Sequence, residues 1–243
     1  MRRLPIVSAA LLYCLPAFAF AEPAAPTKPP GELQFADQFE RDETVPGKEE
    51  LGEGWTTNSP WRAKGHQQVD LVEGSIHITR YPEADHGVAV FHPVDFTDGT
   101  VRLKFRIGKG DQLGVDFADK SLKTVHAGHL CIANITLDKL VINDSKTGRM
   151  DLQIRDRILA KEKSPELTQL LKEKSAVFPL KLKADTWYQL QIQITGNQMT
   201  VSIDGAEVGR LESEGIAHPT KKHIALAVKK EAWVDDVQIW KAK

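Results

Sequence analysis

Residues 115–130, VDFADKSLKTVHAGHL, bring together side chains that can move protons or bind a metal. Asp116, Asp119, His126 and His129 all lie in this short span. A carboxylate and an imidazole within reach of one substrate bond can act as general acid and base. We therefore predict Asp116 and His129 as the catalytic residues of any reaction the protein performs.

The H-x-x-H pattern of His126 and His129 also suggests that the two histidines could bind a metal ion. Residues i and i+3 of a strand point to opposite faces, so one ion binds both only if the chain turns at Ala127 and Gly128. Zinc needs three or four ligands in defined geometry, and this spacing is not a standard one. Neutral histidines hydrogen-bonded within a loop remain an alternative.

A second candidate site consists of polar residues that share one phase of two predicted strands. They are Arg102, Lys104 and Arg106 on one strand, and Gln189, Gln191 and Gln193 on another. On a concave sheet they would form a polar groove for a hydroxyl-rich ligand, and Trp61 is an aromatic ring that could stack on its apolar face. The alternative is an ordinary solvated face, since antiparallel sheets carry such residues on their wet side.

The elements that position these residues are strands. Apolar and polar residues alternate along 100–107, 113–117 and 189–194, and turn signals such as Gly196-Asn197 and Asp204-Gly205 separate the runs. We predict an all-β sandwich. Only residues 151–174 depart from this pattern, because they are rich in helix formers and Ser164-Pro165-Glu166 resembles a helix start. They predict a short helical insertion, which could cover a loop end or act as a lid.

The first 32 residues lie outside this domain. Residues 1–21 have a basic start, an apolar core and an Ala-x-Ala end, which predicts a secretory signal peptide and an exported protein. Cys14 permits a lipoprotein alternative, although Tyr13 before it fits poorly. Residues 22–32, rich in Pro and Ala, are predicted to be a flexible linker, and 33–243 one domain.

The amino-acid composition limits the classes of partner that the sequence supports. Lys plus Arg number 32 and Asp plus Glu 33, for a net charge of −1, so charge gives no reason to propose nucleic acid or an anionic membrane as partner. No segment after the signal peptide is long and apolar enough to span a bilayer. Cys131 is the one cysteine left after cleavage, and its apolar strand predicts a buried structural thiol.

An ordered set of segments resembles the concanavalin-like, or laminin-G-like, jelly-roll superfamily. The segments are FADQFER (35–41), GWTTNSPWRAKG (54–65), VEGSIHI (72–78), TVRLKFRIG (100–108), WYQLQIQITGNQMTVSIDG (187–205) and WVDDVQIW (233–240). Within the superfamily the chain looks most like secreted bacterial proteins labelled 3-keto-disaccharide hydrolase or family-16-like glycosidase. The Glu-x-Asp-x-x-Glu strand of family 16 is absent from the sequence, which argues against a family-16 glycanase.

The resemblance also implies a structural calcium ion near the chain ends, with Asp37, Glu40 and Asp236 as ligands. Hard oxygen ligands suit Ca²⁺, which takes six to eight of them. The alternative is that these carboxylates cap strand ends by accepting backbone hydrogen bonds.

Three functions fit these observations. The first is a secreted carbohydrate-binding jelly-roll domain that recognises a glycan on a concave polar sheet face. The second is a glycoside hydrolase, of the 3-keto-disaccharide hydrolase kind, on the same fold. The third is a protein-interaction module without catalysis. A binder should show aromatic rings in a groove, an enzyme a pocket with two acids or an acid and a histidine, and a protein-binding module an exposed apolar patch. The sequence does not determine the oligomeric state.

Overall fold

The computed structural model describes residues 29–243. The predicted signal peptide and residues 22–28 of the predicted linker lie outside this range. The described chain is mostly β, with two antiparallel sheets packed face to face and a few short helices, as the alternation predicted. In this range no helix has the length and hydropathy needed to cross a membrane.

The first sheet joins the two ends of the domain. Its order is β13 (Ala206–Glu212), β12 (Gln198–Ile203), β11 (Tyr188–Thr195), β6 (Gly99–Arg106), β15 (Glu231–Lys241), β4 (Ser75–Thr79) and β3 (Val69–Val72). β1 (Glu32–Asp37) also pairs with β15, so the first and last strands are neighbours. Asp37 lies opposite Val237 across that pair.

The second sheet carries the candidate catalytic strand. Its order is β10 (Ser175–Pro179), β9 (Lys139–Asp144), β8 (His129–Ile135), β7 (Leu113–Ala118), β14 (Lys221–Val228), β5 (Val88–Phe96) and β2 (Thr56–Thr57). β7 lies between β8 and β14, at the centre of the sheet. A central strand has partners on both sides, which holds its side chains in place.

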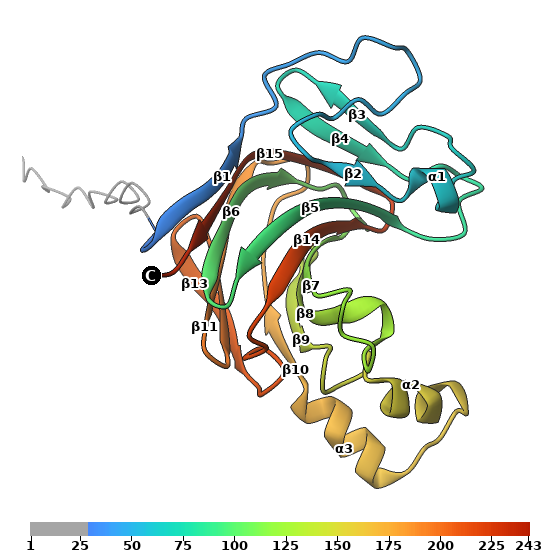
Figure 1. Cartoon of the computed structure of the whole chain (residues 1–243), viewed down its shortest axis with the longest axis vertical. Helices are drawn as coiled ribbons and strands as arrows, with labels where there is room; N and C mark the ends of the chain where they lie inside the picture. Colours follow the sequence, from blue (N-terminus) through green and yellow to red (C-terminus); the bar gives the residue numbers. More distant parts are fainter. Residues whose placement is uncertain (1–28) are drawn as a thin grey trace, which may run out of the picture.

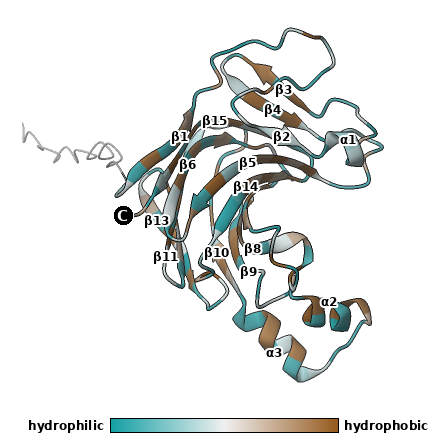
Figure 2. Ribbon diagram, in the orientation of Figure 1, coloured by the Kyte–Doolittle hydropathy of each residue, from teal (hydrophilic) through white to brown (hydrophobic). Residues whose placement is uncertain are grey.

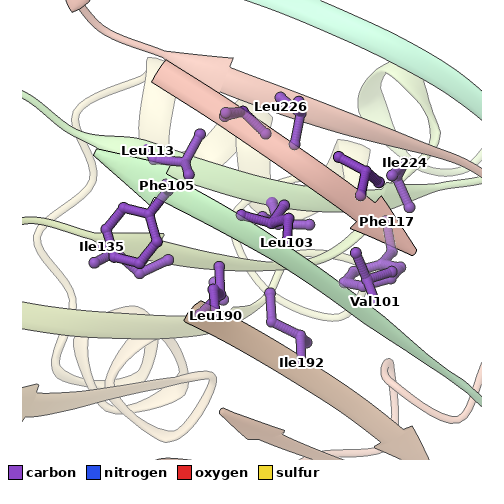
Figure 3. Packing of buried hydrophobic residues seen from close by; sticks show 14 of the residues in the cluster. Val101, Leu103, Phe105, Leu113, Phe117, Ile135, Leu190, Ile192, Ile224 and Leu226 are labelled. Atoms are coloured by element: carbon purple, nitrogen blue, oxygen red, sulfur yellow. The ribbon is translucent and has the colours of Figure 1, made fainter. Parts of the chain in front are cut away.

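The core lies between the two sheets. Alternate residues of each strand point inward because side chains alternate across a strand. β6 and β11 contribute Leu103, Phe105, Leu190 and Ile192 from one sheet. From the other sheet β7, β8 and β14 contribute Leu113, Phe117, Ile135, Ile224 and Leu226, and the two sets pack together (Figure 3). Cys131 is fully buried in this core, which confirms the structural reading of its thiol.

The predicted helical insertion is present between β9 and β10. It consists of α2 (Leu152–Leu159) and α3 (Pro165–Glu173). Ser164 caps α3 by accepting a hydrogen bond from the Leu167 amide (3.3 Å), and Leu167 is the residue of α3 that is buried. Both helices show polar and apolar sides (Figure 2). They project from the end of the sandwich beside β8 and β9 (Figure 1).

Two short helical turns complete the description. α1 (Ser59–Arg62) follows β2, and a 3₁₀ turn, η1 (His126–Gly128), precedes β8. Buried Asn58 anchors α1 to β5: its side chain donates to the Gly87 carbonyl (2.8 Å) and accepts from the Ala89 amide (3.0 Å). Both turns lie next to the outer face of the second sheet, and both line the cavity described below.

Candidate functional site

The outer face of the second sheet places Asp116 in a row of residues that come from four adjacent strands. Phe91 of β5 pairs with Ala225 of β14, Ala225 pairs with Asp116 of β7, and Asp116 pairs with Ile132 of β8. Residues directly opposite one another share a face of the sheet. All four therefore lie on the face that points away from the core.

His129 reaches the same face because the pairing of β7 and β8 is irregular at this point. Phe117 pairs with Cys131, but Ala118 pairs with His129, so one residue of β8 is skipped. With regular alternation Ala118 would lie opposite Leu130, and His129 would turn toward the core. A bulge of this kind re-aims a side chain, and here it places His129 beside Asp116.

The turn before β8 depends on a glycine. Gly128 has φ +72°, and a Cβ built on it would lie 2.1 Å from the carbonyl oxygen of Asp119. The Asp119 amide in turn donates to the Gly128 carbonyl (2.9 Å). Only glycine accepts both this φ and this approach. The close contact of Asp119 and Gly128 closes the 119–128 loop and sets the entry of the chain into β8.

Asp119 also holds the other end of this loop. Its carboxylate accepts from Ser121 (amide 2.9 Å, Oγ 2.6 Å) and from Thr220 Oγ1 (2.5 Å). Burial raises the pKa of Asp119, but the hydrogen bonds from Ser121 and Thr220 outweigh it and bring the pKa to about 2. Asp119 is therefore a structural carboxylate, and of the two aspartates in the segment only Asp116 meets a histidine of the cavity.

The central contact of the site joins His129 Nδ1 to Asp116 Oδ2. Asp116 is 3% exposed, and its Oδ1 is buried without a hydrogen-bond partner in the described chain. The His129 side chain is 34% exposed, and its Nε2 makes no hydrogen bond to residues 29–243. The carboxylate therefore lies behind the imidazole, and Nε2 is the nitrogen that can meet a substrate.

The two groups change each other's affinity for protons. Burial raises the pKa of Asp116, and the hydrogen bond from His129 reverses only part of that rise. Burial alone would lower the pKa of His129, but the hydrogen bond and the charge of Asp116 together raise it. The pair thus holds a proton to a higher pH than an isolated histidine would, which suits a general base that works near neutral pH.

The pair lies in a cavity of about 470 Å³. Small residues of adjacent strands, Ala89, Ala225 and Ala227, line it next to Asp116. Its sides include Trp61 of α1 and Phe91 of β5, whose rings are nearly parallel (17°) with centroids 6.5 Å apart. The cavity thus combines a polar reactive pair with aromatic surface, a combination that suits a sugar ring.

Cationic and histidine side chains surround the pair. Lys120 Nζ lies 4.6 Å from the centroid of the Phe91 ring, and the ring of His126 is 6.4 Å from that of His129. Burial and the charge of Lys120 lower the pKa of His223 to about 4, so its imidazole is neutral at pH 7. α2 of the insertion contributes Arg155, whose charge acts on both His126 and His129. Two cationic side chains, Lys120 and Arg155, thus act on the histidines of this region.

The predicted polar groove lies on the other sheet. β6 and β11 are neighbours as expected, with Gln191 opposite Arg102 and Gln189 opposite Lys104. Arg106 lies near two indole rings, 4.5 Å from the centroid of Trp233 and 5.2 Å from that of Trp187. These residues belong to the first sheet, whereas Asp116 and His129 belong to the second. Of the seven residues proposed for this second candidate site, Trp61 lines the cavity that contains Asp116 and His129.

The three predicted calcium ligands do not form a common cluster. The Asp37 carboxylate accepts from Arg41 Nη1 and Nη2 (2.7 and 2.8 Å), from the Phe39 amide (2.9 Å) and from Trp55 Nε1 (2.8 Å). Its oxygens are therefore occupied by donors, as in the strand-cap alternative.

The other two ligands differ in their surroundings. Glu40 lines a surface cavity with Asp37, whereas Asp236 accepts from Gln238 Nε2 (2.9 Å) and lies 3.6 Å from Lys104 Nζ. Among residues 29–243 no group of three or more His, Cys, Asp or Glu residues is arranged to hold an ion. Calcium binding stays a prediction from the resemblance.

Sequence reasoning missed most residues that line the cavity, among them Phe91, Lys120 and His223. The segment HIALAV (223–228) carried a signal for the last, since His223, Ala225 and Ala227 alternate with Ile224, Leu226 and Val228. One face of this strand is apolar, and the other carries two alanines and a histidine. Small side chains on that second face leave space for a cavity over the sheet. Phe91 and Lys120 gave no such signal, because their proximity depends on the packing of the 119–128 loop over β5.

Comparison with solved structures shows the fold. A non-specific endo-β-1,3(4)-glucanase of family GH16 matches with a TM-score of 0.58 and 13% identity, over 91% of this chain and 95% of that one. A laminarinase from Rhodothermus marinus matches with a TM-score of 0.56 and 12% identity, over 87% and 97%. The carbohydrate-binding module CBM66 from Bacillus subtilis matches with a TM-score of 0.51 and 13% identity, over 77% and 96%.

The architecture is therefore the concanavalin-like jelly roll that carbohydrate-binding modules share with glycoside hydrolases. No curated protein matches the chain in sequence. A family model does match, over residues 42–240, which is most of the described domain. On the strength of that match, the chain belongs to the family of 3-keto-alpha-glucoside-1,2-lyase-like domains.

Proposed function

We propose that the protein is an enzyme that cleaves the glycosidic bond of a sugar carrying a ketone at C3, by elimination across C1 and C2. The observation that carries this proposal is the Asp116–His129 pair in a cavity lined by Trp61 and Phe91. The family's description, a lyase-like domain for 3-keto-α-glucosides, supports the same chemistry.

The reaction needs one base and a way to hold developing charge. The ketone at C3 makes the C2 proton acidic, and His129 Nε2 takes that proton while Asp116 holds Nδ1. The electrons of the C2–H bond pass first into an enolate on C3. They then form the C1–C2 double bond as the C1–O bond breaks, and the departing oxygen takes up a proton. The products are an unsaturated 3-keto sugar and an alcohol.

The surroundings of the pair suit this path. The enolate oxygen carries negative charge, which the Lys120 ammonium can stabilise and to which the neutral imidazole of His223 can donate a hydrogen bond. Both side chains line the same cavity as His129. His126 is a further donor for the departing oxygen.

The composition of the cavity favours elimination over direct hydrolysis of an unoxidised glycoside. Retaining and inverting glycosidases use two carboxyl groups that flank the scissile bond. Among the described residues that line this cavity, Asp116 is the one acid, and its carboxylate lies behind His129. One carboxylate paired with one imidazole matches a single proton transfer at carbon.

The test compares two substrates that differ only in oxidation at C3. Purified protein is given methyl α-glucoside and its 3-keto derivative, and formation of the conjugated ketone is followed by ultraviolet absorbance. We expect turnover of the 3-keto sugar alone, and a loss of about 10²- to 10⁴-fold in kcat for His129→Ala. Equal cleavage of the unoxidised glucoside, or full activity of His129→Ala, would overturn the proposal.

A second candidate is a carbohydrate-binding domain without catalysis. Trp61 supports it, because this indole is 61% exposed beside the cavity, as a stacking platform for a sugar would be. In the same experiment this candidate requires binding of the glucoside by calorimetry with no product from either substrate. We further propose, from residues 1–21, that the protein acts after export from the cytoplasm.

A further inference from the structure

A second cavity adjoins the first and shares Trp61 with it. This cavity, here called the outer pocket, has a volume of about 470 Å³. Residues from the 47–51 segment, from β2 and from α1 line it, among them Lys48, Leu51, Thr56, Pro60 and Gln67. Trp61 lines both cavities, so its ring forms part of the wall of each.

The outer pocket continues the row of residues that contains Asp116. Phe91 pairs with Ala225 on one side and with Thr56 of β2 on the other. Neighbouring strands lie about 4.8 Å apart, so Thr56 is about 14 Å from Asp116 along this row. A span of this length exceeds one pyranose ring. The two cavities therefore lie along the same row of paired residues, and Trp61 lines both of them.

The lining of the outer pocket fits a sugar. Trp61 supplies exposed apolar surface, whereas Trp55 and Leu51 line the pocket as largely buried side chains. Lys48, Thr56 and Gln67 supply polar groups. A sugar ring presents CH faces and hydroxyl groups side by side, so it needs both kinds of partner.

The acid of the outer pocket, Glu49, has a structural role. Its Oε1 accepts from Ser59 Oγ (2.6 Å), from the Gln68 amide (2.7 Å) and from the Val69 amide (3.1 Å), and its Oε2 accepts from Thr57 Oγ1. These bonds tie β2, α1 and β3 together. Glu49 therefore shapes the pocket and is not available as a second catalytic carboxylate.

We propose that the outer pocket binds the leaving-group sugar of a disaccharide substrate, with Trp61 between the two sugar-binding positions. This inference rests on the proposed function. The sugar that reacts lies over Asp116 and His129, and the group joined to it through the scissile bond must occupy the adjoining space. The outer pocket is the cavity that shares a wall with the reactive one.

The experiment blocks the outer pocket without touching the reactive pair. Thr56 is exposed, and phenylalanine suits a strand position, so Thr56→Phe fills the pocket while it keeps β2. Thr195→Phe is the matched control, because Thr195 is an exposed strand residue of the first sheet that lines neither cavity. Each variant is assayed with a 3-keto disaccharide and with 3-keto methyl α-glucoside, whose leaving group is too small to reach the pocket.

We expect Thr56→Phe to lower kcat/KM for the disaccharide about tenfold or more, mainly through KM, with less than a threefold change for the methyl glucoside. We expect Thr195→Phe to change neither value. Equal effects of Thr56→Phe on both substrates, or no effect on either, would overturn the proposal. If Thr56→Phe does not fold, as judged by circular dichroism, Thr56→Gln gives the same comparison.

A binding measurement separates this inference from the proposed reaction. His129→Ala protein, with and without Thr56→Phe, is titrated with an unoxidised disaccharide and with methyl α-glucoside. A loss of disaccharide affinity of about tenfold in the doubly substituted protein supports the outer pocket even if no substrate is ever turned over. Turnover of 3-keto substrates with no selective effect of Thr56→Phe would retain the proposed function and remove the outer pocket.

Discussion

Asp116 and His129 lie on neighbouring strands, and the carboxylate of Asp116 holds the Nδ1 side of the His129 ring. The contact exists because the pairing of β7 with β8 passes over one residue near the start of β8. This irregularity places His129 on the face of the sheet that carries Asp116. This one relationship connects the backbone pairing, the proton affinity of the imidazole and the proposed chemistry.

Replacement of Asp116 by Asn should shift the pH dependence of the reaction. Asp116 raises the pKa of His129, so its neutral replacement lowers that pKa, and His129 becomes deprotonated at lower pH. We expect the acidic limb of the kcat/KM profile to move to lower pH. The plateau should fall about 10²-fold or more, because the imidazole becomes a weaker and less well oriented base. Asp138→Asn, at an exposed turn, should leave the profile unchanged.

Gly128 should be required for both stability and activity. A Cβ in Gly128→Ala meets the Asp119 carbonyl at 2.1 Å, and φ is +72°. We expect a loss of about 2–4 kcal/mol in the free energy of unfolding, and a fall in activity as His129 moves. Gly110→Ala is the control, since Gly110 has φ +84° but nothing within 4 Å. It should cost about 1–2 kcal/mol. Equal Tm values for the two variants would contradict the role assigned to the Asp119 contact.

Lys221 should be a buried structural cation. It is fully buried, and its Nζ donates to the carbonyls of Thr97 (2.6 Å), Ile216 (2.8 Å) and His218 (2.8 Å). Lys221→Met leaves these carbonyls without their donor, so urea unfolding should show a loss of about 3 kcal/mol or more. Lys222→Met, next in sequence but exposed, should change stability by less than about 1 kcal/mol. A small effect at both positions would show that water replaces the ammonium.

His223 should make the protein less stable in acid. Its pKa is about 4 in the folded protein, against 6.5 for an ordinary histidine, so the unfolded chain binds the proton more readily. Stability should therefore fall as pH decreases from about 6.5 to about 4. In His223→Gln, the loss in free energy of unfolding between these two pH values should be smaller by about 1–2 kcal/mol. This value allows for solvent screening of the partly exposed His223 side chain. Tm measured across that pH range checks the slope, and an identical slope in the variant would exclude His223 as its source.

Glu43 should have the opposite effect, because its ionisation should lower the stability of the folded protein as the pH rises. Burial and the nearby Asp70 carboxylate raise the pKa of Glu43 to about 7, against 4.5 for an ordinary glutamate. The folded protein keeps this proton longer than the unfolded chain, so stability should fall as pH rises from about 4.5 to about 7. Glu43→Gln should raise Tm at pH 8 but not at pH 4, with a gain of about 1 kcal/mol. Asp42→Asn, at an exposed neighbour, provides the control.

The strands, their buried faces and several turns follow from local sequence patterns. Alternation along β6, β7 and β11 is sufficient because a strand has a period of two, and a buried face must be apolar whatever its partner is. The insertion was readable from Ser164, a local cap for α3. The Asp116–His129 pairing was expected from chemistry and short separation, and it is present in the structure.

The assignment of strands to the two sheets depends on long-range packing and could not be predicted from local patterns. Arg102 and Asp116 both belong to strands of the same alternating kind, and nothing local says that β6 and β7 belong to opposite sheets. Pairing between β2, β5 and β14 positions Phe91 and Thr56 at the cavities, and the 119–128 loop positions Lys120 there. Pairing between strands distant in sequence depends on the packing of the whole core, because each strand has many partners of similar pattern. A local period cannot choose among them.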